Sequence, residues 1–127
     1  MNGDMLDTNV IIKYLAGDES AKRLIDNAFE VSIPAIVVGE LHYGAQKSSR
    51  KDSNSALFSN FLSSFAIISI DESIAATYGE VKEQLRKKGV TIPENDVWIA
   101  ATGKSRQCRL ITYDAHFKSV EGLNVTP

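Results

Sequence analysis

Four acidic side chains interrupt or end apolar stretches of this chain, and together they could hold a divalent cation. They are Asp7, Glu40, Asp96 and Asp114. Desolvating a lone carboxylate costs several kcal/mol, so a buried acid normally has a partner. If the four converge, their simplest shared partner is Mg²⁺ or Mn²⁺, because hard cations prefer oxygen ligands.

Such a cation would give the chain a definite chemistry. Carboxylates within a few ångströms of one another repel and raise each other's pKa, and a bound cation removes that penalty. A metal can lower the pKa of a coordinated water and neutralise charge on a phosphodiester, and two metals about 4 Å apart can clamp the attacking and leaving oxygens. The sequence contains no P-loop, no G-x-G-x-x-G, no G-x-S-x-G and no Cys/His metal signature.

Each acid also has a purely structural interpretation. Asp7 suits a helix cap, Asp96 a first-turn residue that favours the helix dipole, and Asp114 a turn. Glu40 could extend to solvent or pair with a lysine. The coincidence of all four favours a shared site over four separate structural roles.

Strands and helices alternate along the chain. Strands are expected to end at residue 6 and to span 31–33, 66–70, 109–112 and 123–125. Helices are expected from residue 8 or 9 to 16 and over 19–27, 34–46, 56–65, 71–88 and 96–104, with a polar loop at 48–54 and a short helical turn at 115–120. In this interpretation Thr8 or Asn9 caps the first helix, and Asn95 caps the last long one. The alternation predicts one α/β domain over residues 1–127, with a parallel sheet between two layers of helices.

This layout places the acids at one edge of the sheet. Sites in open α/β sheets form outside the carboxyl ends of the strands. Asp7 ends the first strand, Asp114 follows the fourth, and Asp96 begins a helix. Glu40 must reach them from its helix, where it shares a face with Ile36 and Tyr43.

Composition and charge set further limits. The 127 residues are 43% hydrophobic and 24% charged, with a net charge of −2, which argues against binding nucleic acid through bulk basic charge. Three local basic clusters suit either solvated helix ends or contacts to phosphate groups. They are Lys47, Arg50 and Lys51; Arg86, Lys87 and Lys88; and Lys104, Arg106 and Arg109.

We expect a cytoplasmic protein that does not enter a membrane. No apolar run approaches the roughly 20 residues that span a bilayer, and residues 1–4 lack the pattern of a signal peptide. The single cysteine, Cys108, excludes an internal disulfide and suits a reducing compartment.

Segments in a fixed order resemble the PIN-domain nucleases, specifically the VapC-type toxins of bacterial toxin–antitoxin pairs. They are residues 6–12, 33–45, 92–101 and 110–117, followed by a similar ending at 120–125. Each segment carries one of the four acids, except the ending. One such motif alone would be weak, whereas all of them in order over nearly the whole chain are specific.

The resemblance implies a fold, an activity and partners. The fold would be three-layer α/β/α with a central parallel five-stranded sheet. The activity would be that of a Mg²⁺- or Mn²⁺-dependent endoribonuclease, with Asp7, Glu40, Asp96 and Asp114 as catalytic and metal-binding residues and Asn9, Asn95 and Thr112 as supporting polar residues. The substrate would be structured RNA, with tRNA as the expected target. The chain would form a homodimer and be neutralised by a VapB-like antitoxin, whose C-terminal segment inserts a basic residue into the acidic cleft.

Other residues that could bear on function receive structural interpretations. We expect His116 to be a packing or turn residue rather than a general base, and His42 to be structural or interfacial. The aromatic residues Tyr14, Tyr43, Phe58 and Trp98 are expected in the core or at a dimer interface rather than as base-stacking platforms.

Three alternative functions stay open at this point. A phosphoacceptor signalling domain has a similar size and layout, but it needs paired acids after the first strand and a lysine after a late strand, whereas here Asp4 is separated from Asp7 and the fourth strand leads to Asp114. A binding-only member would keep the cleft without turnover, which the complete acid set disfavours. A DNA-directed PIN nuclease would use the same acids.

Overall fold

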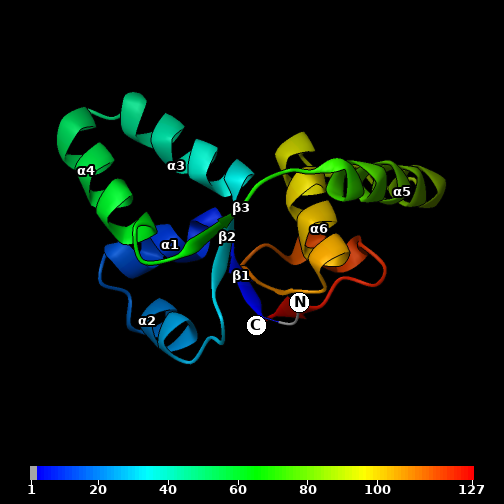
Figure 1. The fold of residues 1–127 in the computed structure, drawn as a ribbon, viewed down its shortest axis with the longest axis horizontal. Coiled ribbons are helices and arrows are strands. Elements are labelled where there is room, and N and C mark those ends of the chain that lie inside the picture. Colours follow the sequence, from blue (N-terminus) through cyan, green and yellow to red (C-terminus); the bar gives the residue numbers. More distant parts are fainter. Residues whose placement is uncertain (1–2) are drawn as a thin grey trace.

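A parallel five-stranded sheet lies at the centre of the structure, a computed structural model that describes residues 3–127 (Figure 1). Its strands are β1 (Asp4–Leu6), β2 (Ser32–Pro34), β3 (Ala66–Ile68), β4 (Arg109–Ile111) and β5 (Val125–Thr126). They lie in the order β3-β2-β1-β4-β5, and every neighbouring pair is parallel. The central strand β1 therefore lies next to β4, so the ends of these two strands share one edge of the sheet.

Helices cover both faces of the sheet, which confirms the predicted three-layer α/β/α fold. They are α1 (Thr8–Leu15), α2 (Glu19–Asp26), α3 (Ala35–Gln46), α4 (Lys51–Leu62), α5 (Glu72–Lys88), α6 (Glu94–Arg106) and the 3₁₀ helix η1 (Ala115–Ser119). Figure 1 shows α1 to α4 on one side and α5 and α6 on the other. Within these layers α1 packs on α2, α3 on α4, and α5 on α6.

Aspartate caps and glycine stops set several helix boundaries. The Asp18 and Asp71 carboxylates accept hydrogen bonds from the backbone N–H groups of Ala21 and Ile74, which satisfies donors that the first helical turn leaves unpaired. Gly89 ends α5 in the left-handed conformation, with a φ of 70° that only glycine adopts without strain.

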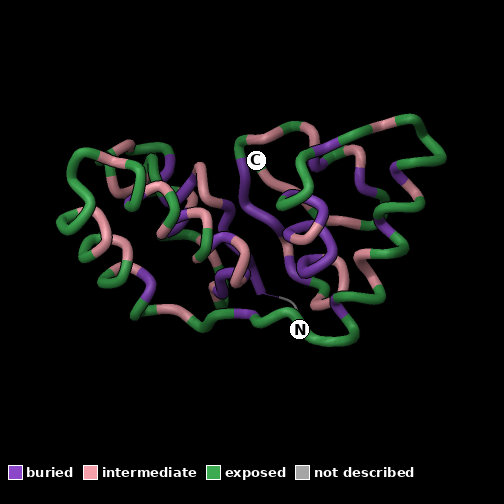
Figure 2. The backbone as a smooth tube through the Cα atoms, turned by 90° about the horizontal axis from the view of Figure 1, so that it is seen from above, coloured by how far each residue is buried: buried purple, intermediate pink, exposed green. Residues whose placement is uncertain are grey.

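The core lies between the layers and is mainly aliphatic. Met5 and Leu6 are fully buried, as are Ile33 on β2 and Leu110 on β4. Figure 2 shows the buried backbone concentrated in the middle of the molecule, with the outer helix faces exposed. No helix within residues 3–127 combines the length and the apolar character needed to cross a bilayer.

The structure corrects several of the predicted boundaries. The second strand spans Ser32–Pro34 rather than 31–33, the fourth ends at Ile111 rather than residue 112, and the helix predicted over 56–65 ends at Leu62. The predicted loop at 48–54 is wrong because α4 begins at Lys51; its first turn faces solvent and so needs no apolar residue. The third strand ends at Ile68 rather than residue 70, and the fifth begins at Val125 rather than residue 123. The helix that carries Asp96 begins at Glu94, two residues earlier than predicted, and Pro93 rather than Asn95 precedes it.

Candidate active site

A cleft of about 500 Å³ opens at the carboxyl edge of the sheet and gathers the four predicted acids. Its lining residues are Asp7, Thr8, Asn9, Ile12, Glu40, Pro93, Glu94, Asn95, Asp96 and Asp114. Strand ends supply two of the acids, because Asp7 follows β1 and Asp114 lies just beyond the adjacent β4. Helices supply the other two, Glu40 from α3 and Asp96 from the first turn of α6.

Asp7 is the most buried acid of the cleft, with 3% of its surface exposed. Its Oδ1 accepts the backbone N–H of Thr8 at 2.9 Å and its Oδ2 accepts the Thr112 hydroxyl at 2.7 Å. Burial is the main cause that raises the pKa of Asp7 from 3.8 to about 6, the charges of Asp96 and Glu40 contribute less, and the two hydrogen bonds act in the opposite direction. Asp7 is thus both the cap of α1, in place of the predicted Thr8 or Asn9, and the deepest oxygen donor of the site.

Glu40 reaches the cleft from the middle of α3 and is held by two polar side chains. The Thr8 hydroxyl donates to Glu40 Oε1 at 2.6 Å, and the Asn95 amide donates to Oε2 at 3.4 Å. Asn95 is free to make this contact because it lies inside α6 rather than capping it. The local sequence suggests only a capping role for Thr8, because its contact with Glu40, 32 positions away, leaves no local signal.

Asp96 is held by His116, which the sequence suggests only as a packing or turn residue. His116 Nε2 lies 2.7 Å from Asp96 Oδ2 and 4.0 Å from Asp114 Oδ2, while its ring also packs at 4.9 Å on Phe117. Burial raises the pKa of Asp96, and the hydrogen bond and charge of His116 act in the opposite direction. His116 therefore combines the expected packing position, against Phe117 in η1, with contacts to two of the four acids.

Thr112 and Asn9 connect the strand ends around the acids, as supporting polar residues should. Thr112 Oγ1 donates to Asp7 and accepts the backbone N–H of Asp114 at 3.0 Å, so one hydroxyl orients two acids. Asn9 Oδ1 accepts the backbone N–H of Tyr113 at 3.3 Å, which links α1 to the segment after β4.

The donor set fits a hard divalent cation. One ligand atom from each of Asp96, Asp114 and His116 lies within 4.8 Å of the other two. Burial raises the pKa of both Asp7 and Asp96, so the cationic groups near them do not offset the desolvation of the two carboxylates. A divalent cation among these oxygens would supply it.

Asp4 provides a contrast at the opposite end of β1. It is buried, but its carboxylate receives both Nε and Nη2 of Arg109, at 2.9 and 3.0 Å, and the backbone N–H of Phe29 at 2.8 Å. This acid is fully paired and separated from Asp7 by the length of the strand. The paired acids that a phosphoacceptor domain needs after its first strand are therefore absent from the described residues.

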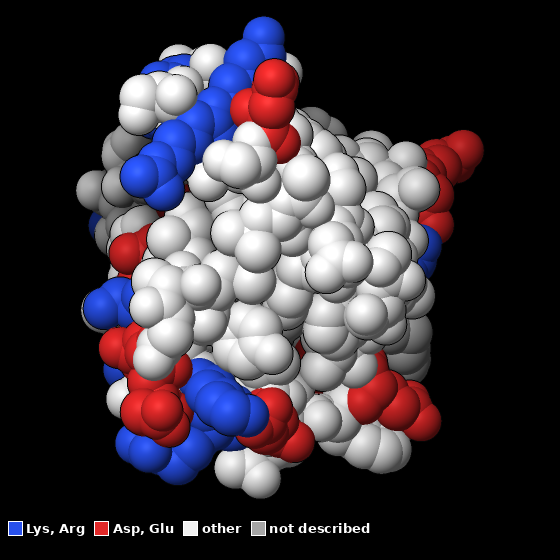
Figure 3. Space-filling model, turned by 90° about the vertical axis from the view of Figure 1, so that its left-hand side faces the viewer, with Lys and Arg blue, Asp and Glu red and all other residues white. Residues whose placement is uncertain are grey.

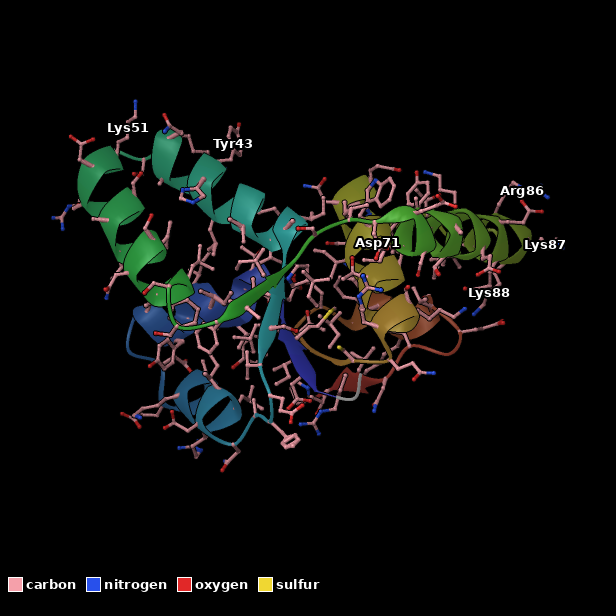
Figure 4. All side chains as sticks on the ribbon, viewed as in Figure 1. Tyr43, Lys51, Asp71, Arg86, Lys87 and Lys88 are labelled. Carbon is pink, nitrogen blue, oxygen red and sulfur yellow. The ribbon has the colours of Figure 1, made fainter. Side chains whose placement is uncertain are left out.

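The basic clusters differ in what they contact. Arg86 pairs with Glu83, Arg106 with Asp71, and Arg109 with Asp4, so these cations are committed to acids of the fold. Figure 4 shows Arg86, Lys87 and Lys88 at the outer end of α5, on the opposite side of the molecule from Tyr43. Lys47 instead lies on α3 in a groove next to the cleft.

The chain is similar in sequence and in structure to known proteins. The sequence pattern of the PIN domain matches residues 5–123. The chain is 37% identical over 110 residues to Ribonuclease VapC2 of Haemophilus influenzae, covering 85% of this chain and 83% of that protein. It is 29% identical over 122 residues to the tRNA(fMet)-specific endonuclease VapC of Shigella flexneri, covering 94% and 92%. The VapBC2 structure from Rickettsia felis, bound to a promoter DNA fragment, contains a chain that superposes with a TM-score of 0.91 at 30% identity and with 99% and 98% coverage.

Proposed function

The chain belongs to the PIN domain family, among its VapC-type nucleases, and from this premise we propose that it is an endoribonuclease that depends on Mg²⁺ or Mn²⁺. The observation that carries the proposal is the convergence of Asp7, Glu40, Asp96 and Asp114 on one cleft. Segments far apart in the sequence supply these acids. Two of them, Asp7 and Asp96, are buried, and burying a charged carboxylate lowers the stability of the fold. A shared cation and an anionic substrate account for that arrangement.

The four acids would hold the metal, and the surrounding polar groups would orient them. When bound, the metal would activate a water and neutralise charge on the phosphodiester. Thr112 and the backbone of Thr8 fix the carboxylate of Asp7, while the Thr8 hydroxyl fixes Glu40. His116 holds Asp96 through Nε2, at 2.7 Å from Asp96 Oδ2.

RNA is the proposed substrate, and tRNA the proposed class. The curated relatives are named as ribonucleases, and the Shigella protein as a tRNA endonuclease. The test is digestion of total tRNA, a synthetic RNA and DNA of matched sequence, with Mg²⁺, with Mn²⁺ and with EDTA. We expect RNA cleavage that needs the metal, and faster cleavage of RNA than of DNA.

Two variants assign the activity to the cleft. Asp7→Asn and Asp96→Asn should lower the cleavage rate by at least 100-fold, because each removes a charged metal ligand and keeps the shape of the side chain. Asp52→Asn is the matched control, since Asp52 is exposed on the first turn of α4. Cleavage that persists in EDTA, or in both cleft variants, would refute the proposal.

We also propose that the protein forms a homodimer and is neutralised by a VapB-like antitoxin. The Rickettsia chain is described in a VapBC2 complex. Figure 3 shows that the side of this molecule formed by α1, α2 and α4 is uncharged in its middle, with charged residues above and below. A groove of about 280 Å³ on that side is lined largely by apolar residues, namely Tyr14, Leu15, Leu57, Phe61 and Phe65 with Asn60 and Ser64. A contiguous apolar surface of this kind suits a protein partner.

Light scattering on the purified protein tests the dimer, with twice the mass of one chain as the expected result. For the antitoxin, the product of the neighbouring reading frame should bind the nuclease and stop RNA cleavage. A monomer would contradict the first proposal, and full activity in the presence of that product would contradict the second.

A further inference from the structure

One face of α3 carries side chains of different chemical type at successive helical turns, starting at the acid cleft. Ile36, Glu40, Tyr43 and Lys47 follow one another at spacings of four, three and four residues, which places them along a single face. Glu40 reaches into the cleft, Tyr43 lies one turn further, and Lys47 lies at the helix end. The face thus offers an acid, an aromatic ring and a cation in sequence.

This face forms one wall of a groove that continues the cleft. The α3 groove, as we call it, has a volume of about 690 Å³, and it shares Thr8, Ile12, Glu40 and Asn95 with the acid cleft. Its other lining residues are Ala35, Ile36, Gly39, Tyr43, Gly44 and Lys47. A polymer whose phosphate reaches the acids can therefore continue into the α3 groove without leaving the surface.

Tyr43 lines the α3 groove and leaves most of its side chain exposed to solvent. It is 66% exposed and extends from α3 into solvent (Figure 4), so of its two expected positions the core is excluded and the dimer interface stays a prediction. The Lys47 ammonium lies 5.0 Å from the centre of its ring. Within residues 3–127 no acidic side chain pairs with Lys47, in contrast to Arg86, Arg106 and Arg109.

We propose that the α3 groove is a nucleotide subsite, in which Tyr43 stacks on an unpaired base of the RNA and Lys47 contacts the adjoining phosphate. This proposal rests on the proposed ribonuclease function. Aromatic rings beside cations are the usual means of holding unpaired RNA, because every base has a face that can stack. A protein partner explains the apolar residues Ile12 and Ile36, but it does not require a free cation beside the ring in a groove that leads into the acids.

Two glycines make the proposal testable without disturbing the acids. A Cβ added at Gly44 would meet no atom within 4 Å, so a larger side chain there would enter the groove rather than the core. Gly79, an exposed glycine on α5, is equally open and lies outside the groove. Gly44→Leu and Gly79→Leu are therefore a matched pair, and neither should lower the melting temperature, because glycine is a poor helix former.

The experiment measures binding of a fluorescein-labelled RNA stem–loop by anisotropy in Ca²⁺, with a gel to verify that the probe stays intact. We expect Tyr43→Ala and Gly44→Leu each to weaken binding roughly tenfold, and Tyr43→Phe to bind like the wild type. Phe29→Ala and Gly79→Leu are the controls and should bind like the wild type, since Phe29 is 59% exposed on the loop between α2 and β2. Lys47→Ala should lower the slope of log affinity against log salt by about 0.7, the value for one phosphate contact on a single strand.

The outcomes separate this proposal from the one on which it rests. Wild-type protein that neither binds nor cleaves RNA would overturn both. If the wild type cleaves RNA and the Tyr43→Ala and Gly44→Leu variants bind the stem–loop normally, the subsite proposal alone is overturned. A change from dimer to monomer in Tyr43→Ala, without loss of RNA affinity per active protein, would assign the groove to a second copy of the chain. Loss of binding to the antitoxin with RNA binding retained would assign it to that partner.

Discussion

At the scale of single residues, each acid of the cleft is oriented by a polar group from elsewhere in the chain. Thr112 holds Asp7, Thr8 holds Glu40, and His116 holds Asp96. The hydrogen bond from Thr112 does not offset the burial of Asp7, since the pKa of Asp7 is still raised to about 6. The site is therefore costly for the metal-free protein.

That cost predicts a stabilising substitution. Folding raises the pKa of Asp7 from 3.8 to about 6, so between these values the folded protein holds a proton that the unfolded chain releases. Stability thus falls as pH rises through this window and stays lower above it. A shift of about two units corresponds to about 3 kcal/mol, of which loss of the Thr112 hydrogen bond offsets about 1 kcal/mol. We expect Asp7→Asn to stabilise the metal-free protein by roughly 2 kcal/mol at pH 7.5.

Urea unfolding in EDTA checks this prediction, with Asp52→Asn as the control. At pH 3, below both pKa values, the folded and unfolded forms of wild-type Asp7 are both largely protonated, so the advantage of Asn should disappear there. A destabilised Asp7→Asn variant at pH 7.5 would show that the carboxylate is compensated within the protein.

The same pKa predicts the pH dependence of metal binding. A cation must displace the proton of Asp7, so affinity should rise about tenfold per pH unit up to about pH 6 and then level off. Isothermal titration with Mn²⁺ between pH 5 and 8 measures this dependence. A flat profile in that range would mean that Asp7 does not bind the metal.

At the scale of helices and strands, the parallel β1–β4 pair and the start of α6 set the geometry of the site. The sequence was sufficient to predict that Asp7 and Asp114 lie at one edge of the sheet, because strands that alternate with helices pair in parallel. It was not sufficient for His116 or for the contact between Thr8 and Glu40, since these depend on how η1 and α3 pack onto the rest of the fold. The exposure of Tyr43 depends likewise on which face of α3 the neighbouring helices leave open.

The helix α6 approaches β1 closely at Gly103. A Cβ at Gly103 would lie 2.9 Å from Leu123 Cδ1 and 3.0 Å from Met5 Cε, so this buried glycine lets the helix approach β1. Gly103→Val should therefore destabilise the protein by about 1–3 kcal/mol through overpacking. Thermal unfolding measures the change, and Gly79→Val, at an open helical position, should cost less than about 0.5 kcal/mol. Equal effects of the two substitutions would show that α6 can shift without cost.

At the scale of the whole molecule, charge is distributed so that the cleft stays negative. The arginines at positions 86, 106 and 109 pair with acids outside the cleft. Among the described residues, His116 is the one histidine in contact with acids of the cleft, namely Asp96 and Asp114. The uncharged side of α1, α2 and α4 and the α3 groove are different surfaces, so a protein partner and RNA could bind at different places. The roles proposed for both surfaces assume that the cleft binds a metal.

The most direct test of that cleft is the binding of Mn²⁺ followed by electron paramagnetic resonance at pH 7.5. The wild type and Asp52→Asn should bind Mn²⁺ with equal affinity, and Asp7→Asn and Asp96→Asn should each bind it at least tenfold more weakly. Equal Mn²⁺ affinity in all four proteins would contradict the claim that these acids form a metal site.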